Sequence, residues 1–251
     1  MKIIVSSSMK MNTLQDVPEP KELPVYLDQT EKILAWMKKQ SPEVLRTLWE
    51  CGDKIAEENF KRLNQMDLRK GLTPAIYSFT GTIFRYMGVL LFKKKEIDYL
   101  QDHLRILSGF YGVLKPLDGV VPHRLSMWPK VKVDIDGKKD LFGFWGRKIF
   151  EGVRDESGVI VNLASDKYDG YMNKYLAEDD RYLTIRFYES NDKEKMKERG
   201  IHTQMAKGQM VRYMVEKRIE NPNDLIKFDY MGYAFREDLS TYRKFIFERK
   251  E

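Results

Sequence analysis

Residues 107–127 constrain the fold of this chain more than any other stretch of its sequence. The segment reads "LSGFYGVLKPLDGVVPHRLSM", with a glycine on either side of an aromatic pair and two prolines further along. Glycine allows tight turns and close approach to the backbone, whereas proline stiffens the chain and removes an amide donor. Neither a regular helix nor a long strand accommodates this pattern. We therefore expect a turn after a strand, where the backbone passes close to another group.

Two interpretations of this stretch stay open. In one, the turn is purely structural and encloses the aromatic pair as a rigid plug. In the other, backbone amides around Gly109 and Gly112 stay exposed and bind phosphate oxygens. Arg105 before the turn and Arg124 after it favour an anionic ligand.

The composition places the chain among globular proteins. Hydrophobic residues make up 42% of its 251 residues and aromatic residues 12%, which is enough for a real core and excludes global disorder. The 44 basic residues against 38 acidic ones give a formal charge of +6. A mild basic excess is compatible with a polyanion partner and does not establish one.

Cysteine, histidine and hydropathy patterns limit the location and the chemistry. Cys51 is the only cysteine, so an intramolecular disulfide and a thiolate metal cluster are excluded and a reducing compartment fits. The amino-terminal apolar run is too short for a signal peptide, and no stretch has the length of a membrane span. The three histidines lie far apart, without ligand spacing. We expect a soluble cytoplasmic protein with no metal ion, no cofactor and no membrane partner.

Apolar periodicity and turn signals predict a mixture of strands and helices. Strands are expected at 3–5, 75–79, 104–107, 158–163, 182–189 and 244–249. Helices are expected at 26–39, from Ser41-Pro42 onward, at 53–66, 96–104, 142–153 and 165–176, and after Ile201. Asp136-Gly137 indicates a hairpin within 131–142, and the charged segment 191–200 is expected to be solvated.

The two element types do not alternate regularly along the chain, which favours an α+β or mixed α/β fold. We also find no internal repeat and no linker composition. The sequence therefore predicts one compact domain over residues 1–251, with a central mixed sheet flanked by helices.

The helix expected after Ile201 carries an arginine on an apolar face. Arg212 projects into a stripe with helical spacing. The stripe consists of Ile201, Met205, Gly208, Val215 and Ile219. A guanidinium there requires a buried carboxylate partner or a ligand cavity, and both alternatives stay open. Gly208 inside a helix costs about 1 kcal/mol relative to alanine, which indicates close packing or ligand approach.

Polar residues follow two of the expected buried strands. Asn162 and Ser165 come at the end of the strand at 158–163, and Ser7 and Lys10 follow the first strand. Ligands collect at the carboxyl ends of parallel strands. Capping of the next helix is the alternative explanation for Ser165.

Five segments, in chain order, resemble the YaaA family of peroxide-stress proteins. They are "LRILSGFYGVLKPLDGVVPHRLSM", "FGFWG", "VNLASDKY", "AKGQMVRY" and "GYAF", and the resemblance covers nearly the whole chain. The first segment is the specific one. The family positions that the resemblance carries over are Lys10, Arg105, Ser108, Gly109, Tyr111, Gly112, Pro116, Asp118, Pro122, Arg124, Trp145, Asn162, Ser165, Tyr168, Gly208 and Arg212.

The resemblance implies one domain of unusual topology, with a basic cleft and a helix-hairpin-helix-like element. It also implies a link to hydrogen peroxide tolerance, restraint of free iron, and binding of duplex or distorted DNA, but no established reaction. The chain departs from the family pattern in charge and in ring type. Lys115 and Lys207 stand where arginine is usual, which loses the planar fork. The other departures are Ser8-Met9 for Pro-Ala, His123 for tyrosine, Ser126 for glutamate and Thr203-Gln204 for Ala-Lys.

These observations favour a monomeric DNA-binding stress protein over an enzyme for a small ligand. In the first hypothesis, a cleft of basic side chains contacts phosphates, and Tyr111 or Trp145 stacks on an unpaired base. In the second, hydroxyl and amide groups at strand ends form a pocket for a nucleotide, nucleobase or other small anion. No catalytic residue is assigned. The candidate binding residues are Ser7, Lys10, Arg105, Ser108, Gly109, Tyr111, Gly112, Lys115, Arg124, Trp145, Asn162, Ser165, Lys207 and Arg212.

Overall fold

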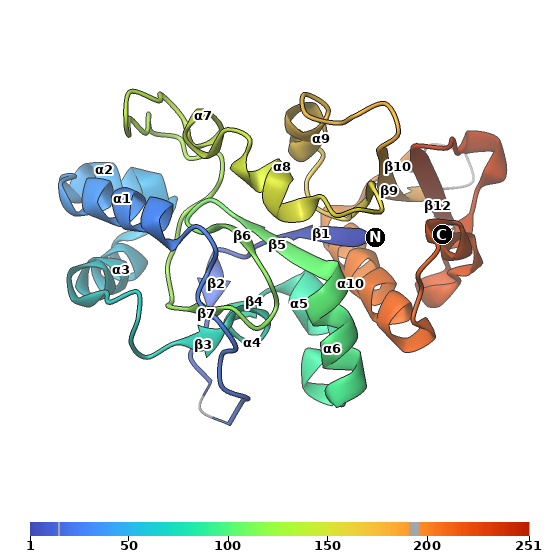
Figure 1. The fold of residues 1–251 in the computed structure, drawn as a ribbon, viewed down its shortest axis with the longest axis horizontal. Coiled ribbons are helices and arrows are strands. Elements are labelled where there is room, and N and C mark those ends of the chain that lie inside the picture. Colours follow the sequence, from blue (N-terminus) through green and yellow to red (C-terminus); the bar gives the residue numbers. More distant parts are fainter. Residues whose placement is uncertain (15, 191–195, 251) are drawn as a thin grey trace. The chain divides into compact units, whose positions relative to one another are not determined.

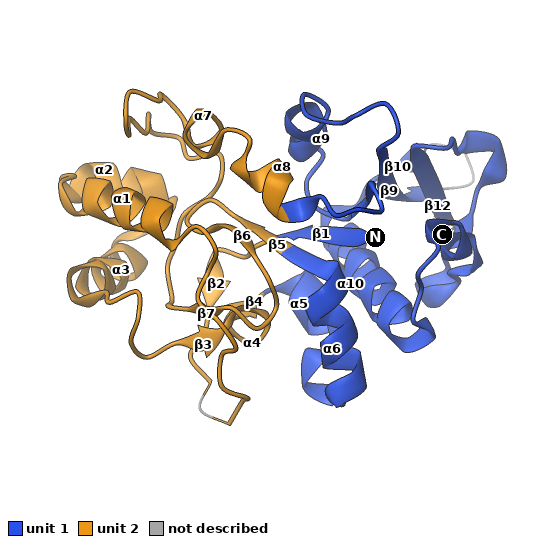
Figure 2. Ribbon diagram, in the orientation of Figure 1, with its two compact units in different colours: residues 1–6, 81–105, 153–251 blue, residues 7–80, 106–152 orange. Residues whose placement is uncertain are grey.

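The computed structural model describes residues 1–14, 16–190 and 196–250 and has a mixed α/β fold, as the sequence predicts (Figure 1). The residues group into two compact units (Figure 2). Unit 1 comprises residues 1–6, 81–105 and the described part of 153–251, and unit 2 comprises 7–80 and 106–152. Each unit is thus assembled from separate stretches of the chain. The single domain expected from the sequence stays a prediction.

The main sheet is mixed and has the strand order β11-β12-β9-β8-β1-β5-β6, with β10 paired to β9. Strands β1, β8, β9 and β12 form a parallel set within unit 1, whereas β10 pairs antiparallel with β9 and β11 pairs antiparallel with β12. Strand β5 begins in unit 1 and ends in unit 2. The strand bounds are β1 Lys2–Ser6, β5 Leu104–Ser108, β6 Gly112–Leu114, β8 Val159–Asn162, β9 Arg181–Ser190, β10 Met196–Lys197, β11 Ala234–Phe235 and β12 Lys244–Lys250.

The inner strands of unit 1 are apolar because parallel strands are covered on both faces. Ile3 to Val5 of β1 and Ile160 and Val161 of β8 are fully buried. The helices of this unit are α5 Thr82–Met87, α6 Lys94–His103, α9 Lys167–Met172 and α10 Gly200–Lys217. Its short 3-10 helices are η1 Val89–Leu91, η2 Pro222–Lys227, η3 Tyr230–Gly232 and η4 Glu237–Leu239.

Helix α10 packs on α5 through Gly208. A β-carbon at this position would lie 2.4 Å from the carbonyl oxygen of Ile83 and 2.8 Å from Cβ of Tyr86. Of the two alternatives for this glycine, the structure therefore favours close helix packing. The prediction that the apolar stripe begins at Ile201 is wrong, because Ile201 lies in the first turn of α10 and is 62% exposed.

Unit 2 contains the remaining helices and two short ladders. Helix α2 begins as predicted, since Pro42 is its first residue and Ser41 Oγ accepts a hydrogen bond from the amide of Val44 at 3.4 Å. Strand β2 pairs with β4 and β3 pairs with β7. The bounds are α1 Leu27–Lys38, α2 Pro42–Trp49, α3 Asp53–Gln65, α4 Ala75–Ser78, α7 Leu141–Trp145, α8 Lys148–Val153, β2 Lys10–Met11, β3 Thr73–Pro74, β4 Phe79–Thr80 and β7 Gly119–Val120.

The strand predicted at 75–79 is wrong, because most of it is helix α4. The amides of Ala75 and Ile76 donate to the carbonyl oxygens of Asp118 and Pro116, so they are not available to a sheet. Only Phe79–Thr80 remains as strand β4.

Two further elements are shorter than the sequence suggests. The hairpin at Asp136-Gly137 is a tight turn with positive φ at both residues, closed by a single bridge between Ile135 and Lys138. The helix predicted at 142–153 is split into α7 and α8, because Gly146 takes a φ of 52°. Of the segment 191–200, residues 191–195 lie outside the described residues.

Among the described residues, no helix combines the length and the apolar character that crossing a membrane requires.

Gly208→Ala should destabilise the protein although alanine favours helix. The new methyl group meets backbone of α5 that cannot move aside cheaply, so we expect a loss of about 1–3 kcal/mol in the free energy of unfolding. Gly170→Ala is the matched control, since a β-carbon in α9 meets nothing within 4 Å. It should stabilise by up to about 1 kcal/mol. Urea unfolding measures both; equal effects of the two changes would contradict the packing role of Gly208.

Candidate functional site

The fourteen candidate residues fall into two groups, one in each unit. Nine lie in unit 2: Ser7, Lys10, Ser108, Gly109, Tyr111, Gly112, Lys115, Arg124 and Trp145. Five lie in unit 1: Arg105, Asn162, Ser165, Lys207 and Arg212.

In unit 2, the turn between β5 and β6 is closed by its own contacts. Ser108 Oγ accepts hydrogen bonds from the amides of Phe110 and Tyr111, both at 3.2 Å. A β-carbon on Gly109 would lie 2.6 Å from the carbonyl oxygen of Ser126. Gly112 has a φ of +72°, and a β-carbon there would lie 2.8 Å from the ring of Trp145. These contacts favour the structural interpretation of the turn.

Tyr111 and Trp145 do not stack on a base in this structure, because both side chains are fully buried. Trp145 Nε1 donates to the carbonyl oxygen of Gly109 at 3.0 Å, and the amide of Val121 donates to the hydroxyl of Tyr111 at 3.2 Å. Each polar atom thus has a partner inside unit 2, and neither ring offers a face to solvent. The buried position of both rings does not support the stacking role expected for these two residues, which stays a prediction.

His123 lies in the same buried cluster and was not among the expected site residues. Its ring stacks on Phe110 with 4.7 Å between the ring centroids. Nδ1 lies 3.0 Å from the carbonyl oxygen of Val121, which can only accept, so this nitrogen carries the proton. Burial lowers the pKa of His123 to about 4, with the hydrogen bond to Val121 acting in the opposite direction. The imidazole is therefore neutral at pH 7.

In unit 1, the carboxyl ends of β1 and β8 meet at the point where the strand order reverses. The chain continues from β1 to β5 on one side and later to β8 on the other, which is where open α/β sheets bind ligands. The amide of Ser165 donates to Ser6 Oγ at 3.1 Å. Lys207 Nζ donates to the carbonyl oxygen of Ala164 at 2.7 Å. This point of the sheet is therefore occupied by the protein's own polar groups.

Lys207 is buried among charged groups of unit 1. Burial lowers the pKa of its ammonium to about 8, and the guanidinium of Arg186 acts in the same direction. The carboxylates of Glu198, Asp166 and Asp169 oppose the shift. The charge of Lys207 is thus held inside the protein near neutral pH and not presented at the surface.

Asp169 in α9 gathers the polar side chains at this end of the sheet. It accepts hydrogen bonds from Asn162 Nδ2 at 2.7 Å, Tyr182 Oη at 3.2 Å, Thr184 Oγ1 at 3.4 Å and Arg186 Nη2 at 3.2 Å. One sequence signal points to Asp169, namely an acidic residue one turn after the expected cap at Ser165. A cavity of about 370 Å³ lies beside this cluster. Its lining includes Asp169, Asn173, Glu178, Tyr182, Thr184 and Arg243.

The match to known proteins decides the family. A profile described as "Peroxide stress protein YaaA" matches residues 1–239. The chain belongs to the YaaA family of peroxide stress proteins. Relatives that cover the chain carry the name "UPF0246 protein". That of Agathobacter rectalis is 49% identical over 250 residues, covering 100% of this chain and 99% of the relative. That of Pediococcus pentosaceus is 42% identical over 251 residues, covering 100% and 99% respectively.

Most of the basic residues that the DNA-binding hypothesis assigns to phosphates are engaged within the protein. Arg105 donates to the carbonyl oxygens of Gln101 and Leu104, and Lys115 pairs with Glu22 at 2.8 Å. Lys10 is the exception: it is exposed, and no ion pair joins it to any residue that the structure describes.

Within the described part of the chain, Arg212 has neither the buried carboxylate partner nor the ligand cavity that were the two alternatives drawn from the sequence. It pairs with Glu216 one turn along α10 at 2.7 Å, and the two side chains are 30% and 34% exposed. Since the carboxylate is not buried, losing the pair costs no more than the few tenths of a kcal/mol typical of such helix pairs. A β-carbon on Gly88 would lie 2.9 Å from Arg212 Nη1, so the guanidinium packs on α5's terminal glycine.

The buried His123 should make the stability of the protein depend on pH between about 6.5 and 4. In this window the unfolded chain binds a proton that the folded chain does not, so the free energy of unfolding falls as the pH falls. The contribution lost by pH 4 is roughly 3 kcal/mol. His123→Phe keeps a ring and removes the titration, so its unfolding free energy should fall less steeply over the same range. Identical pH slopes in urea unfolding of the two proteins would contradict this account.

Proposed function

We propose that this YaaA-family protein is a cytoplasmic, monomeric stress protein that binds DNA through unit 2. The candidate surface consists of Lys10 and the helical hairpin, by which we mean the connection at residues 50–52 between α2 and α3 and the first turn of α3. The observation that carries the proposal is the position of Arg124, which holds these two segments side by side. Limiting oxidative damage to DNA would connect this binding to the peroxide stress for which the family is named.

Arg124 joins the hairpin to the segment that carries Lys10. Its Nε donates to the carbonyl oxygen of Trp49 at 2.6 Å, its Nη2 to that of Glu50 at 3.3 Å, and its Nη1 to that of Met9 at 3.0 Å. Trp49 ends α2, where carbonyl groups lack helical partners. We therefore assign Arg124 a positioning role in this surface, in place of the direct phosphate contact expected from the sequence.

The hairpin offers groups that suit a phosphate. Helix α3 follows Gly52, which has no side chain to cap the helix, so the first amides of α3 stay open to an anion. Lys54 in this first turn is exposed and, like Lys10, has no ion pair within the described ranges. Backbone amides and lysines contact the DNA backbone without reading sequence.

Carboxylates near the hairpin limit the strength of such binding. Glu50 pairs with Lys130 at 3.2 Å and Asp53 pairs with Arg46 at 3.0 Å, so their charges are locally balanced. The surface therefore contacts few phosphates, and we expect weak affinity with little sequence preference.

DNA binding should depend on salt with a shallow slope. For an uninterrupted duplex, log K should fall with log salt with a slope of about −2 to −3, since each phosphate contributes about −0.9. Lys10→Gln should reduce the magnitude of this slope by about 0.9, the share of one phosphate. Lys94→Gln is the control, because Lys94 is an exposed lysine of unit 1. Fluorescence anisotropy from about 50 to 200 mM salt measures the slopes; a slope that Lys10→Gln leaves unchanged would remove Lys10 from the surface.

The cavity beside Asp169 favours a second function, the binding of a small polar metabolite as an enzyme substrate or a ligand. Four side chains already orient the Asp169 carboxylate, and Arg243 adds a positive charge to the same lining. Small-molecule sites typically have a small number of polar groups that converge on the ligand. The candidate ligand therefore carries an N–H or O–H donor for the carboxylate and an anionic group for the arginine.

A metabolite screen by thermal shift tests the second function. A ligand of this cavity should raise the melting temperature of the protein, and Asp169→Asn should abolish that rise, because the amide donates where the carboxylate accepts. Asp179→Asn serves as the control, since Asp179 is an exposed acidic residue outside the lining. Ligands that stabilise both variants equally would place the binding elsewhere.

A further inference from the structure

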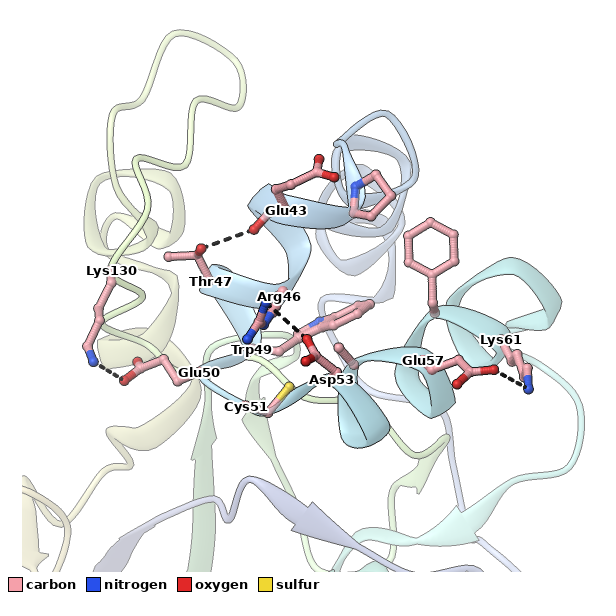
Figure 3. Close-up of a pocket in the computed structure, with 13 residues that line it drawn as sticks. Glu43, Arg46, Thr47, Trp49, Glu50, Cys51, Asp53, Glu57, Lys61 and Lys130 are labelled. Carbon is pink, nitrogen blue, oxygen red and sulfur yellow. Dashed lines mark hydrogen bonds and ion pairs between the residues drawn. The ribbon is translucent and has the colours of Figure 1, made fainter.

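A second cavity lies in unit 2, between α2 and α3, and has a volume of about 740 Å³ (Figure 3). This volume is in the range of sites for small organic ligands. Its aromatic lining consists of Trp49 and Phe60, whose rings meet edge to face with 6.4 Å between centroids. Trp49 is buried, whereas Phe60 is half-buried. The ring of Phe60 is therefore the aromatic surface that a ligand can reach.

The charged groups around this cavity have more capacity to accept hydrogen bonds than to donate them. Each basic side chain of the lining is already paired: Arg46 with Asp53 at 3.0 Å, Lys61 with Glu57 at 3.0 Å, and Lys130 with Glu50 (Figure 3). Glu43 adds a fourth carboxylate. A carboxylate has about four lone-pair sites, whereas arginine has five N–H donors and lysine three, so after these ion pairs the four carboxylates keep more open acceptor sites than the three basic side chains keep donors.

The lining therefore suits an uncharged aromatic ligand that donates hydrogen bonds. We propose that the cavity between α2 and α3 binds a single nucleobase that bears an amino group, namely adenine, cytosine or guanine. The base stacks on Phe60, and its amino group donates to a carboxylate of Asp53 or Glu57. Stacking on aromatic side chains suits every base, whereas a carboxylate accepts from an amino group such as that of cytosine.

The same lining discriminates against other nucleotides. Thymine and uracil present a carbonyl oxygen where cytosine presents its amino group, and this oxygen would face a carboxylate. A phosphate group adds negative charge to a lining with four carboxylates and three basic groups. A nucleoside should therefore bind more tightly than its monophosphate. This inference does not rest on DNA binding, because a free nucleoside and an unpaired base in DNA present the same ring.

Cys51 provides the measurement, since it is the only cysteine and lines the cavity. The reaction of the intact protein with a thiol reagent is followed in the presence of adenosine, cytidine or uridine. Adenosine and cytidine at saturation should slow the reaction by at least about threefold, because a stacked base covers the cavity. Uridine should protect less than either of them, because it presents a carbonyl oxygen where cytidine presents its amino group. Equal protection by all three nucleosides, or protection by none, would overturn the proposal.

Variants separate a ligand role from a structural one. Phe60→Ala should weaken adenosine binding by about 5- to 100-fold, as expected for the loss of base stacking. Phe142→Ala, at a half-buried phenylalanine outside the lining, should not change it. If Phe60→Ala does not fold, Glu57→Gln tests the same site, because Glu57 is 70% exposed. It should reduce the preference for adenosine over uridine; an unchanged preference in both Glu57→Gln and Asp53→Asn would exclude the carboxylates.

Duplexes with a single bulged base identify the source of the nucleobase. If the base comes from DNA, a bulged adenine should bind more tightly than a bulged thymine, and Phe60→Ala should remove that difference. If adenosine protects Cys51 and the two bulges bind equally, the ligand is a free nucleoside. The uninterrupted duplex and Lys10→Gln report on the proposed DNA surface independently, so failure of either proposal leaves the other testable.

Discussion

The arrangement of unit 2 depends on the guanidinium of Arg124. It donates hydrogen bonds to carbonyl groups at the end of α2 that have no partner within that helix. Arg124 donates to the carbonyl oxygen of Met9 and to those of the consecutive residues Trp49 and Glu50, so it joins two parts of the chain that are distant in sequence. The end of α2 needs such a donor, because the last carbonyl groups of a helix have no partner within it. An arginine is suited to this role, since its planar fork offers five donors in fixed directions. The hairpin, Lys10 and the cavity between α2 and α3 all stand next to this contact.

The basic residues show why net charge is a poor guide to a binding surface. A charged group inside a protein is costly unless it has partners, and the structure supplies them mostly from backbone. Lys207 bonds to the carbonyl oxygen of Ala164, and Arg105 bonds to those of Gln101 and Leu104. These two side chains therefore stabilise the fold, whereas the sequence suggested that they contact phosphate. The cationic groups left at the hairpin are few, which is the reason to expect weak electrostatic binding.

Local rules explain which parts of the fold could be predicted from the sequence. The cap at Ser41 and the positive φ at Asp136-Gly137 follow from the chemistry of adjacent residues. The strand predicted at 75–79 failed because the amides of Ala75 and Ile76 bond to a segment some forty residues away. Such a partner overrides propensity and has no local signal.

The candidate site was predictable only in part for the same reason. Asn162 and Ser165 do lie at a strand end, as their position after an apolar run indicated. The sequence could not show that Asp169 orients several of their neighbours, or that Tyr111 and Trp145 are closed off by packing. The cavity at Phe60 left no pattern at all, because its lining comes from two helix faces and a lysine far along the chain.

The interleaving of the two units fixes the order in which they can form during synthesis. Every segment of unit 2 has been made once residue 152 leaves the ribosome, whereas unit 1 waits for β12, whose parallel partner is β9. Until residues 159–162 have been made, β1 lacks β8, its neighbour in the finished sheet, and exposes a run of isoleucine and valine. A nascent chain in this condition has an unpaired apolar strand, which is the kind of surface that chaperones bind. Cutting the gene between any two of these segments would leave at least one unit without a strand or helix that it needs.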